Sequence, residues 1–253
     1  MTRVAVNGAA GRMGRAVIEA ASERDDLDVV VGFHVDDVDD IGGVPIFHAD
    51  DVAEGLAEHD PHVVIDFTVP ESTLALADAC VDAGVGMVVG TTGFDSGGMA
   101  SLRSASQDVP VLKATNFSRG IQVLQRTISE AVAALPDYDL ELMETHHNDK
   151  IDSPSGTANT ILETIQEERD VEPVYGREGH APRQEDEIGV FARRAGDVRG
   201  EHELVLAGND EVVSLSHRAE DRGVFAAGAL DAAAWLAGRD PEWYSFGAVI
   251  DDT

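Results

Sequence analysis

The sequence predicts an α/β protein in which a doubly wound parallel sheet is joined to a second, α+β domain with a mixed or antiparallel sheet. In the first half of the chain, short β-branched runs alternate with helical patterns, as in a parallel sheet with crossover helices. In the second half, strand-like runs follow one another without helices between them. With 253 residues, of which 43% are hydrophobic, the chain can bury two cores.

The first half supplies the elements of a Rossmann-type sheet. Strands are expected over residues 3–7, 29–35, 63–67, 85–89 and 109–112, and helices over residues 13–24, 71–82 and 97–106. The second of these helices has a clear start signal, because Pro70 and Glu71 both favour the positive end of a helix. This alternation predicts a sheet wound on both faces.

The pattern changes after Phe117 to that of the second domain. Helices are expected over residues 120–135, 156–169 and 224–237, and strands over 139–145, 187–194, 202–207 and 211–217. The first two of these helices should cover one face of the strands. The short tail after Pro241 is expected to return to the first domain. The predicted domains are therefore residues 1–117 with 223–253, and residues 118–222.

The charge balance excludes two classes of partner. Acidic residues outnumber basic ones by 48 to 18, and a net charge of −30 would repel nucleic acid and anionic lipid. Lys113 and Lys150 are the only lysines in the sequence. An acidic surface that is poor in lysine is typical of a protein that stays soluble in concentrated salt, where repulsion is screened. We therefore expect a protein from a halophile.

Three further features favour a cytoplasmic protein without a membrane partner. Charged residues interrupt every apolar run before it could span a bilayer. The N-terminus leads directly into a strand-like run instead of a signal peptide. The single cysteine, Cys80, fits a reducing compartment, and its helical surroundings predict that it is buried.

A glycine-rich turn after the first strand predicts a dinucleotide site. Gly8 permits a tight turn, Gly11 lets backbone amides approach a pyrophosphate, and Gly14 lets the following helix pack on the strand. That helix, which is expected to begin at Met13 directly after Arg12 in the loop, offers unpaired N–H groups and partial positive charge. The spacing is G-x-x-G-x-x-G instead of G-x-G-x-x-G, so a structural turn without a ligand is the alternative reading.

Acidic residues after the second strand favour NADH over NADPH. Asp36 lies 22 positions after Gly14, where a carboxylate would accept hydrogen bonds from a ribose diol. Asp37 follows directly, and two carboxylates would repel the 2′-phosphate of NADP. Because Arg12 and high salt would weaken that repulsion, the sequence predicts an NAD(P)H site with a slight preference for NADH.

A second cluster combines a proton donor with an anion site. His146 and His147 are followed by Lys150 and then by the small residues Pro154, Ser155, Gly156 and Thr157 at a predicted helix start. Backbone N–H groups at such a start can hold a carboxylate, and Lys150 adds a positive charge. The combination suits an anionic substrate beside a proton donor.

The same segment, His-His-x-x-Lys-x-Asp-x-Pro-Ser-Gly-Thr-Ala from His146 to Ala158, resembles the signature of the dihydrodipicolinate reductase family. The resemblance extends over nearly the whole chain. Further matches lie at residues 8–14, 66–68, 90–94, 116–118, 177–180, 194–197 and 200–202, and at Arg222.

The resemblance implies an NAD(P)H-dependent reductase of lysine and diaminopimelate biosynthesis. Hydride would pass from the nicotinamide to the ring of an unsaturated cyclic imine dicarboxylate, formed by loss of water from the 4-hydroxy precursor. His146 would donate the proton. Lys150 would bind the substrate and assist its dehydration or its protonation. A substrate carboxylate would be held by His147, Ser155, Gly156 and Thr157. The nicotinamide and its ribose would be surrounded by Phe67, Thr68, Gly90, Thr92 and Asn116. The family pattern also implies a homotetramer joined through the sheets of the second domain, which makes residues 118–222 a substrate-binding and oligomerisation domain.

Two departures from the family pattern and two alternative functions bear on this reading. The arginine that would favour a 2′-phosphate is missing beside Asp36, where Asp37 stands instead. Asn148 and Asp149 stand where many relatives carry basic residues, so substrate binding would depend more on Lys150 and the helix amides. A short-chain dehydrogenase would need Tyr-x-x-x-Lys, and no tyrosine here has a lysine four positions later. A non-catalytic dinucleotide sensor is the alternative from a different class, and it would bind cofactor without turnover.

A metal site is not expected, because the adjacent His146 and His147 would point to opposite faces of a strand. The sequence offers no account of Lys113.

Overall fold

The computed structural model describes residues 1–252, which form two compact units. The first unit contains Met1–Ser118 and the segment from Arg222 on, and the second contains Arg119–Asp221. These divisions lie one residue from the predicted boundaries.

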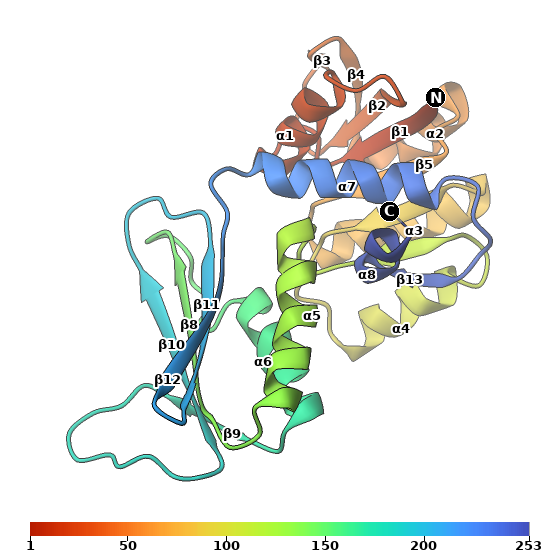
Figure 1. The fold of residues 1–253 in the computed structure, drawn as a ribbon. Helices are drawn as coiled ribbons and strands as arrows, with labels where there is room; N and C mark the ends of the chain where they lie inside the picture. Colours follow the sequence, from red (N-terminus) through yellow and green to blue (C-terminus); the bar gives the residue numbers. More distant parts are fainter. Residues whose placement is uncertain (253) are drawn as a thin grey trace. The chain divides into compact units, whose positions relative to one another are not determined.

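The first unit is built on a sheet of eight strands in the order β13-β7-β6-β5-β1-β2-β4-β3. Its strands β1, β2, β4 and β5 are labelled near the top of Figure 1. The strands are β1 (Thr2–Asn7), β2 (Leu27–His34), β3 (Asp40–Ile41), β4 (Val44–His48), β5 (Val63–Asp66), β6 (Gly86–Val89), β7 (Val111–Lys113) and β13 (Trp243–Ser245). All neighbours are parallel except β3, which is antiparallel to β4. The carboxyl ends of the parallel strands therefore meet at one edge of the sheet, where open α/β sheets bind ligands.

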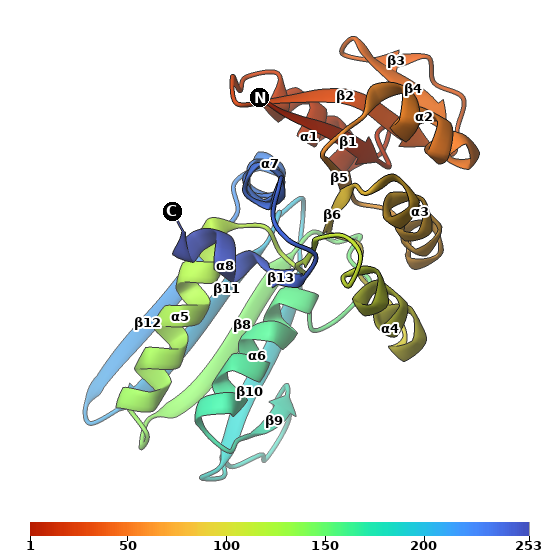
Figure 2. The same ribbon diagram turned by 90° about the vertical axis from the view of Figure 1, so that its right-hand side faces the viewer.

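Helices cover both faces of this sheet, so it is doubly wound as predicted. One core joins alternate strand residues such as Val4 and Val6 to α1 (Arg12–Ala21), α7 (Gly223–Leu236) and α8 (Phe246–Asp251). The other core joins the intervening residues, such as Ala5, to α2 (Val52–His59), α3 (Pro70–Ala83) and α4 (Ser96–Ala105), which lie together in Figure 2. Strand residues are hydrophobic on both sides because neither face meets water.

The second unit contains a five-stranded mixed sheet in the order β12-β11-β8-β10-β9. The strands are β8 (Asp139–His146), β9 (Glu172–Tyr175), β10 (Glu187–Arg194), β11 (Glu201–Gly208) and β12 (Glu211–Arg218). Strand β10 is parallel to β8 and β9, whereas β11 is antiparallel to β8 and β12. Helices α5 (Arg119–Ala134) and α6 (Gly156–Glu168) cover one face through a shared apolar core (Figure 2). The predicted mixed sheet with two helices on one face is confirmed.

The structure adds elements that the sequence did not predict. They are β3, β4, a 3₁₀ turn (Ala49–Asp51), α2, β9, β13 and α8. The predicted return of the tail is confirmed, since β13 pairs with β7. Predicted ends differ by a few residues; α1, for example, ends at Ala21 instead of residue 24. Among residues 1–252, no helix combines the length and apolar character needed to cross a membrane.

Candidate functional site

The loop after β1 forms a tight glycine turn. Gly8 has a φ of +79°, and a Cβ there would lie 2.9 Å from the carbonyl oxygen of Phe67 and from Cγ2 of Thr68. The Gly11 amide donates a 2.9 Å hydrogen bond to the carbonyl oxygen of Gly8. A Cβ on Gly14 would lie 2.2 Å from the same oxygen, so this glycine lets α1 pack directly on the turn.

The start of α1 suits a bound anion. Its N-cap residue is Gly11, so no side chain of that residue caps the helix amides. Among the described residues, the first turn of this helix contains no acidic residue. Arg12 is exposed at this end, and Met13 is half-buried. The unpaired amides and the helix dipole both favour a phosphate here.

A cavity of about 200 Å³ adjoins this turn. Four of the predicted cofactor residues line it, namely Gly8, Gly11, Phe67 and Thr68. The other lining residues, which were not predicted, are Asn7, His34, Val35, Ala49, Val69 and Ser72. The cavity therefore connects the glycine turn to the ends of β2 and β5, as a dinucleotide site requires.

A buried carboxylate, Asp66, organises the ends of these strands. It is fully buried and accepts hydrogen bonds of 2.6–2.8 Å from Asn7, Thr68, Thr73 and Thr91. Burial raises the pKa of Asp66, and the four hydrogen bonds oppose that shift. Asp66 thus fixes Asn7 and Thr68 beside the cavity.

Three other predicted cofactor residues follow β6 and β7 and are not among the residues that line this cavity. A Cβ on Gly90 would lie 2.2 Å from the ring of Phe67, so this glycine makes room for that ring. Thr92 is exposed in the next loop. Asn116 accepts a 2.8 Å hydrogen bond from the Ser118 amide.

Two charged residues lie near the carboxyl ends of strands of the same sheet. Asp36 follows β2 with a side chain that is 83% exposed, and its Oδ2 lies 3.4 Å from Nε2 of His34. Lys113 ends β7, and its Nζ lies 5.6 Å from the centre of the Phe94 ring. Burial lowers the pKa of the Lys113 ammonium.

In the second unit, His146 is held by a buried carboxylate. It is the last residue of β8, and its Nδ1 lies 2.6 Å from Oε2 of Glu144, two residues earlier on the same strand. Burial alone would raise the pKa of Glu144, but hydrogen bonds from His146 and Arg194 lower that pKa to about 2. Because an ionised carboxylate only accepts hydrogen bonds, Nδ1 of His146 carries a proton.

The predicted helix start is confirmed as the N-terminus of α6. Ser155 is its N-cap residue, and the Ser155 hydroxyl accepts a 3.2 Å hydrogen bond from the Ala158 amide. The same hydroxyl lies 3.2 Å from Nε2 of His202, whose ring centre is 5.3 Å from that of His146. Gly156 is exposed and Thr157 is buried in the first turn. Ser155 therefore joins the helix start to the surroundings of His146.

Lys150 lies in the turn between β8 and α6. Its amide donates a 3.2 Å hydrogen bond to the carbonyl oxygen of His147, and its Nζ is 2.8 Å from Oδ1 of Asp152. His147 is half-buried in the same turn. The second unit thus brings the predicted proton donor, the lysine and the helix start into one connected segment.

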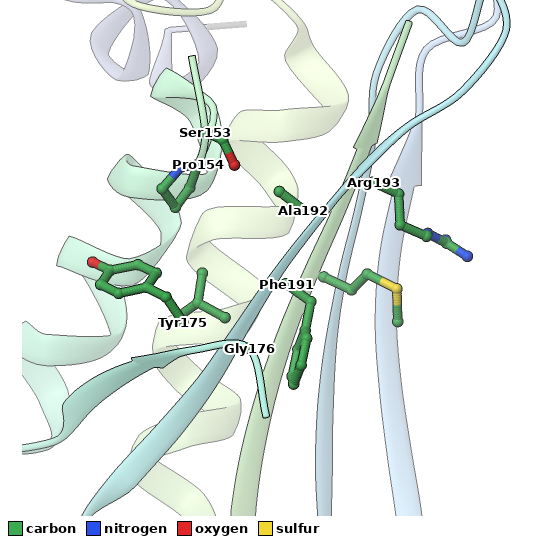
Figure 3. A pocket seen from close by; sticks show the side chains of 9 residues that line it. Ser153, Pro154, Tyr175, Gly176, Phe191, Ala192 and Arg193 are labelled. Carbon is green, nitrogen blue, oxygen red and sulfur yellow. The ribbon is translucent and has the colours of Figure 1, made fainter. Parts of the chain in front are cut away.

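A cavity of about 610 Å³ in the second unit is not lined by His146, Lys150 or Ser155. It is lined by Met143, Ser153, Pro154, Tyr175, Gly176, Val190, Phe191, Ala192 and Arg193. Figure 3 shows Pro154 and Tyr175 on one side of this hollow and Phe191 on the other. Because neither His146 nor Lys150 lines it, we do not assign this cavity to the proton donor.

Sequence reasoning missed the residues that support His146. Glu144 has a signal in the sequence, because residues two apart on a strand share a face. Arg194, Gly200 and His202 belong to segments that match the family, but their positions near His146 depend on how β8, β10 and β11 pair. No cluster of possible metal ligands occurs among residues 1–252.

Comparison with known families decides the assignment. The family model described as dihydrodipicolinate reductase, N-terminus, matches residues 2–117, and the one described as dihydrodipicolinate reductase, C-terminus, matches residues 120–250. The chain belongs to the dihydrodipicolinate reductase family. This membership confirms the predicted family, and with it an NAD(P)H-dependent reductase with a Rossmann-type domain.

Similar proteins agree with this family. The chain is 71% identical to 4-hydroxy-tetrahydrodipicolinate reductase of Haloarcula marismortui, a halophilic archaeon, over 99% of this chain and 100% of that one. It is 54% identical to the reductase of the same name from Natronomonas pharaonis, over 96% and 98% of the two chains. The fold resembles that of dipicolinate-bound dihydrodipicolinate reductase from Paenisporosarcina sp. TG-14, with a TM-score of 0.80, 23% identity and 97% coverage of each chain. The halophilic relative accords with the acidic, lysine-poor composition.

Proposed function

We propose that this chain is a 4-hydroxy-tetrahydrodipicolinate reductase of lysine and diaminopimelate biosynthesis. The observation that carries the proposal is the pairing of His146 with Glu144 beside the N-terminus of α6 and Lys150. This segment offers a proton donor and an anion site. The first unit offers a dinucleotide turn, and close relatives bear the name of this reductase.

The residues of the first unit fit a dinucleotide. Gly8, Gly11, Arg12, Met13 and Gly14 form a turn and an uncapped helix start that would hold the pyrophosphate. Phe67, Thr68, Gly90, Thr92 and Asn116 follow strands β5 to β7, and would surround the nicotinamide and its ribose. The bound dinucleotide would supply the hydride.

The exposed carboxylate of Asp36 supports a preference for NADH. A ribose diol can donate hydrogen bonds to it, whereas a 2′-phosphate would be repelled by Asp36 and by the exposed Asp37. Concentrated salt screens charges that are a few ångströms apart, so the preference is slight.

The second unit would bind the cyclic imine dicarboxylate and deliver the proton. The amides at the start of α6, with Ser155, Gly156, Thr157 and His147, would hold one carboxylate, and Lys150 would supply positive charge. His146, which carries a proton on Nδ1 toward Glu144, would donate from Nε2 to the ring carbon next to the one that receives the hydride. The product is tetrahydrodipicolinate.

We infer a cytoplasmic homotetramer that assembles through the sheet of the second unit. On the face opposite α5 and α6, Met143, Phe191 and Val205 are half-buried, and Val212 is 65% exposed. Apolar side chains on an open sheet face favour contact with another copy. Light scattering in concentrated salt should give four times the mass of one chain, and a monomer would reject the assembly.

The test of function is oxidation of cofactor by substrate. Purified protein in concentrated salt is mixed with enzymatically generated 4-hydroxy-tetrahydrodipicolinate and NADH or NADPH, and nicotinamide absorbance is followed. We expect turnover with both cofactors and a fall of about 100-fold or more in kcat for His146→Gln and for Lys150→Ala. Cofactor binding without turnover in the folded parent protein would instead favour the dinucleotide sensor.

The same assay tests the role of Asp36. Asp36→Ala should raise the ratio of kcat/KM for NADPH to that for NADH by about tenfold, which corresponds to roughly 1.4 kcal/mol. The matched control is Asp39→Ala, which removes another exposed carboxylate from the same loop and should leave the ratio near that of the parent. An unchanged ratio in Asp36→Ala would remove Asp36 from the ribose site.

A further inference from the structure

Arg194 is the last residue of β10, and all of its guanidinium nitrogens donate hydrogen bonds within the second unit. A guanidinium has five N–H donors. Two face Glu144, with 2.8 Å to Oε2 and 2.7 Å to Oε1. The others donate to backbone carbonyl oxygens of Lys150 at 3.2 Å, Asp152 at 2.5 Å and Arg193 at 2.7 Å. One side chain therefore joins the carboxylate behind His146 to the turn that carries Lys150.

Glu144 completes this connection on the other side. Its Oε2 accepts from His146 and Arg194, and its Oε1 accepts from Arg194 and, at 3.1 Å, from the Ser155 amide. Its side chain has no exposed surface. A carboxylate in such a place stays ionised only when it is paired, so the hydrogen bonds from His146 and Arg194 together keep Glu144 charged.

The hydrogen bond between Glu144 and His146 also determines which ring nitrogen of His146 is available to a substrate. Nδ1–H points at Glu144, so Nε2 is the atom left for proton transfer. Gly200 adjoins that atom, because a Cβ at this position would lie 3.1 Å from Nε2. The absence of a side chain at Gly200 leaves room beside Nε2.

We propose that Glu144 and Arg194 are positioning residues for the reaction: Glu144 orients His146 and stabilises its protonated form, and Arg194 fixes Glu144 and the Lys150 turn relative to each other. This inference rests on the proposed function, because it needs His146 as the proton donor. It assigns roles to two residues that do not themselves contact substrate.

The experiment is a double-mutant cycle in the full-length protein in concentrated salt. Glu144→Gln is measured in the parent and in the His146→Gln background, with kcat, KM and the pH–rate profile for each. In the parent background we expect kcat to fall about 100-fold. The pH–rate profile should also move to lower pH, because the imidazolium has lost its anionic partner. In the His146→Gln background the same change should cost less than about threefold, since the group that Glu144 serves is already gone.

Arg194→Lys tests the second half of the inference. A lysine cannot reach Glu144 and three carbonyl oxygens at once, so we expect KM for the substrate to rise about tenfold as well as kcat to fall. The matched control is Arg193→Lys, because Arg193 is the neighbouring arginine and its Nε contacts Thr145 instead of Glu144. This control should keep the parent kinetics.

Folding is checked separately, by circular dichroism and by binding of NADH, which uses residues of the first unit. If Glu144→Gln does not fold, Glu144→Asp provides the test, because it keeps the negative charge and should retain part of the activity. An unchanged pH–rate profile in a folded Glu144→Gln, or an equal loss in both backgrounds, overturns the inference. Full activity of His146→Gln would instead contradict the proposed role of His146 itself.

Discussion

At the scale of single residues, His202 is an imidazole that the fold holds in its neutral form. It is 2% exposed, it shares a hydrogen bond with Ser155, and its Nδ1 is buried without a hydrogen-bond partner in the described residues. Burial, followed by the charge of His146, lowers the pKa of His202 to about 4. Protonation of His202 would place a positive charge about one ring away from His146, where it would repel a protonated His146. A neutral His202 avoids this repulsion.

This has a consequence for stability against pH. The unfolded chain binds a proton at His202 near the ordinary pKa of 6.5, and the folded chain binds it only near 4. The unfolded state therefore holds more protons between these values, and the free energy of unfolding rises with pH across this window. His202 alone should contribute roughly 3 kcal/mol of this rise.

The prediction is checked by urea unfolding at pH 4.5 and pH 7 in constant high salt. His202→Gln keeps a polar group for Ser155 but cannot be protonated, so the rise in free energy of unfolding should become smaller by an amount of that order. His180→Gln, which removes an exposed imidazole, is the control and should retain the parent difference. A His202→Gln protein with the full parent difference would show that His202 is not the group responsible.

At the scale of elements, α7 depends on one glycine. A Cβ on Gly228 would lie 1.8 Å from the carbonyl oxygen of Phe117, so the helix and the segment after β7 pack closer than any other residue would allow. Gly228→Ala should therefore lower the free energy of unfolding by about 3 kcal/mol or more. Gly97→Ala in α4 is the control, because its Cβ would meet only Oδ1 of Asp95 at 3.4 Å, and it should be neutral or slightly stabilising.

Urea or thermal unfolding of both variants decides this prediction. Equal stability of Gly228→Ala and the parent would mean that α7 can move away from Phe117 at little cost. A similar loss in both variants would point to a general effect of alanine in helices instead of a close approach.

The predictability of an element depends on where its stabilising contacts come from. α5 could be predicted because Ile121, Leu124, Ile128 and Val132 repeat at helical spacing and are all buried. α2 was missed because it has only eight residues and contains Gly55. This glycine leaves room for the ring of Phe33, a tertiary contact that the local sequence does not show. β13 has three residues and is defined by pairing with β7, a tertiary contact that no local pattern encodes.

The same distinction applies to the site. His146, Lys150 and the start of α6 lie within one short segment, so their combination was visible in the sequence. Arg194 was not, because it lies 50 positions from Glu144 and reaches it only when β10 pairs in parallel with β8. That register places Arg194 opposite His146.

At the scale of the whole molecule, the net charge of −30 sets the conditions under which the fold is stable. Repulsion among exposed carboxylates opposes the compact state, and salt reduces it. The screening length falls from about 10 Å at 0.1 M salt to about 3 Å at 1 M. The free energy of unfolding should therefore rise steeply as KCl increases through this range.

The exposed face of α6 offers a specific test of this argument. Glu163 and Glu167 are exposed four positions apart on this helix, and the last turn of the helix contains no basic residue. Like charges at this spacing destabilise a helix, and a negative charge near its carboxyl end adds to the effect. Glu163→Gln with Glu167→Gln should raise the free energy of unfolding by about 1 kcal/mol at 0.1 M KCl, and the gain should vanish above about 1 M.

Because salt also strengthens apolar burial in both proteins, the difference between variant and parent isolates the charge repulsion. A gain that persists unchanged at 3 M KCl would show that the glutamines act through packing or helix propensity, and a parent protein as stable in 0.1 M as in 3 M KCl would show that its acidic surface does not require salt.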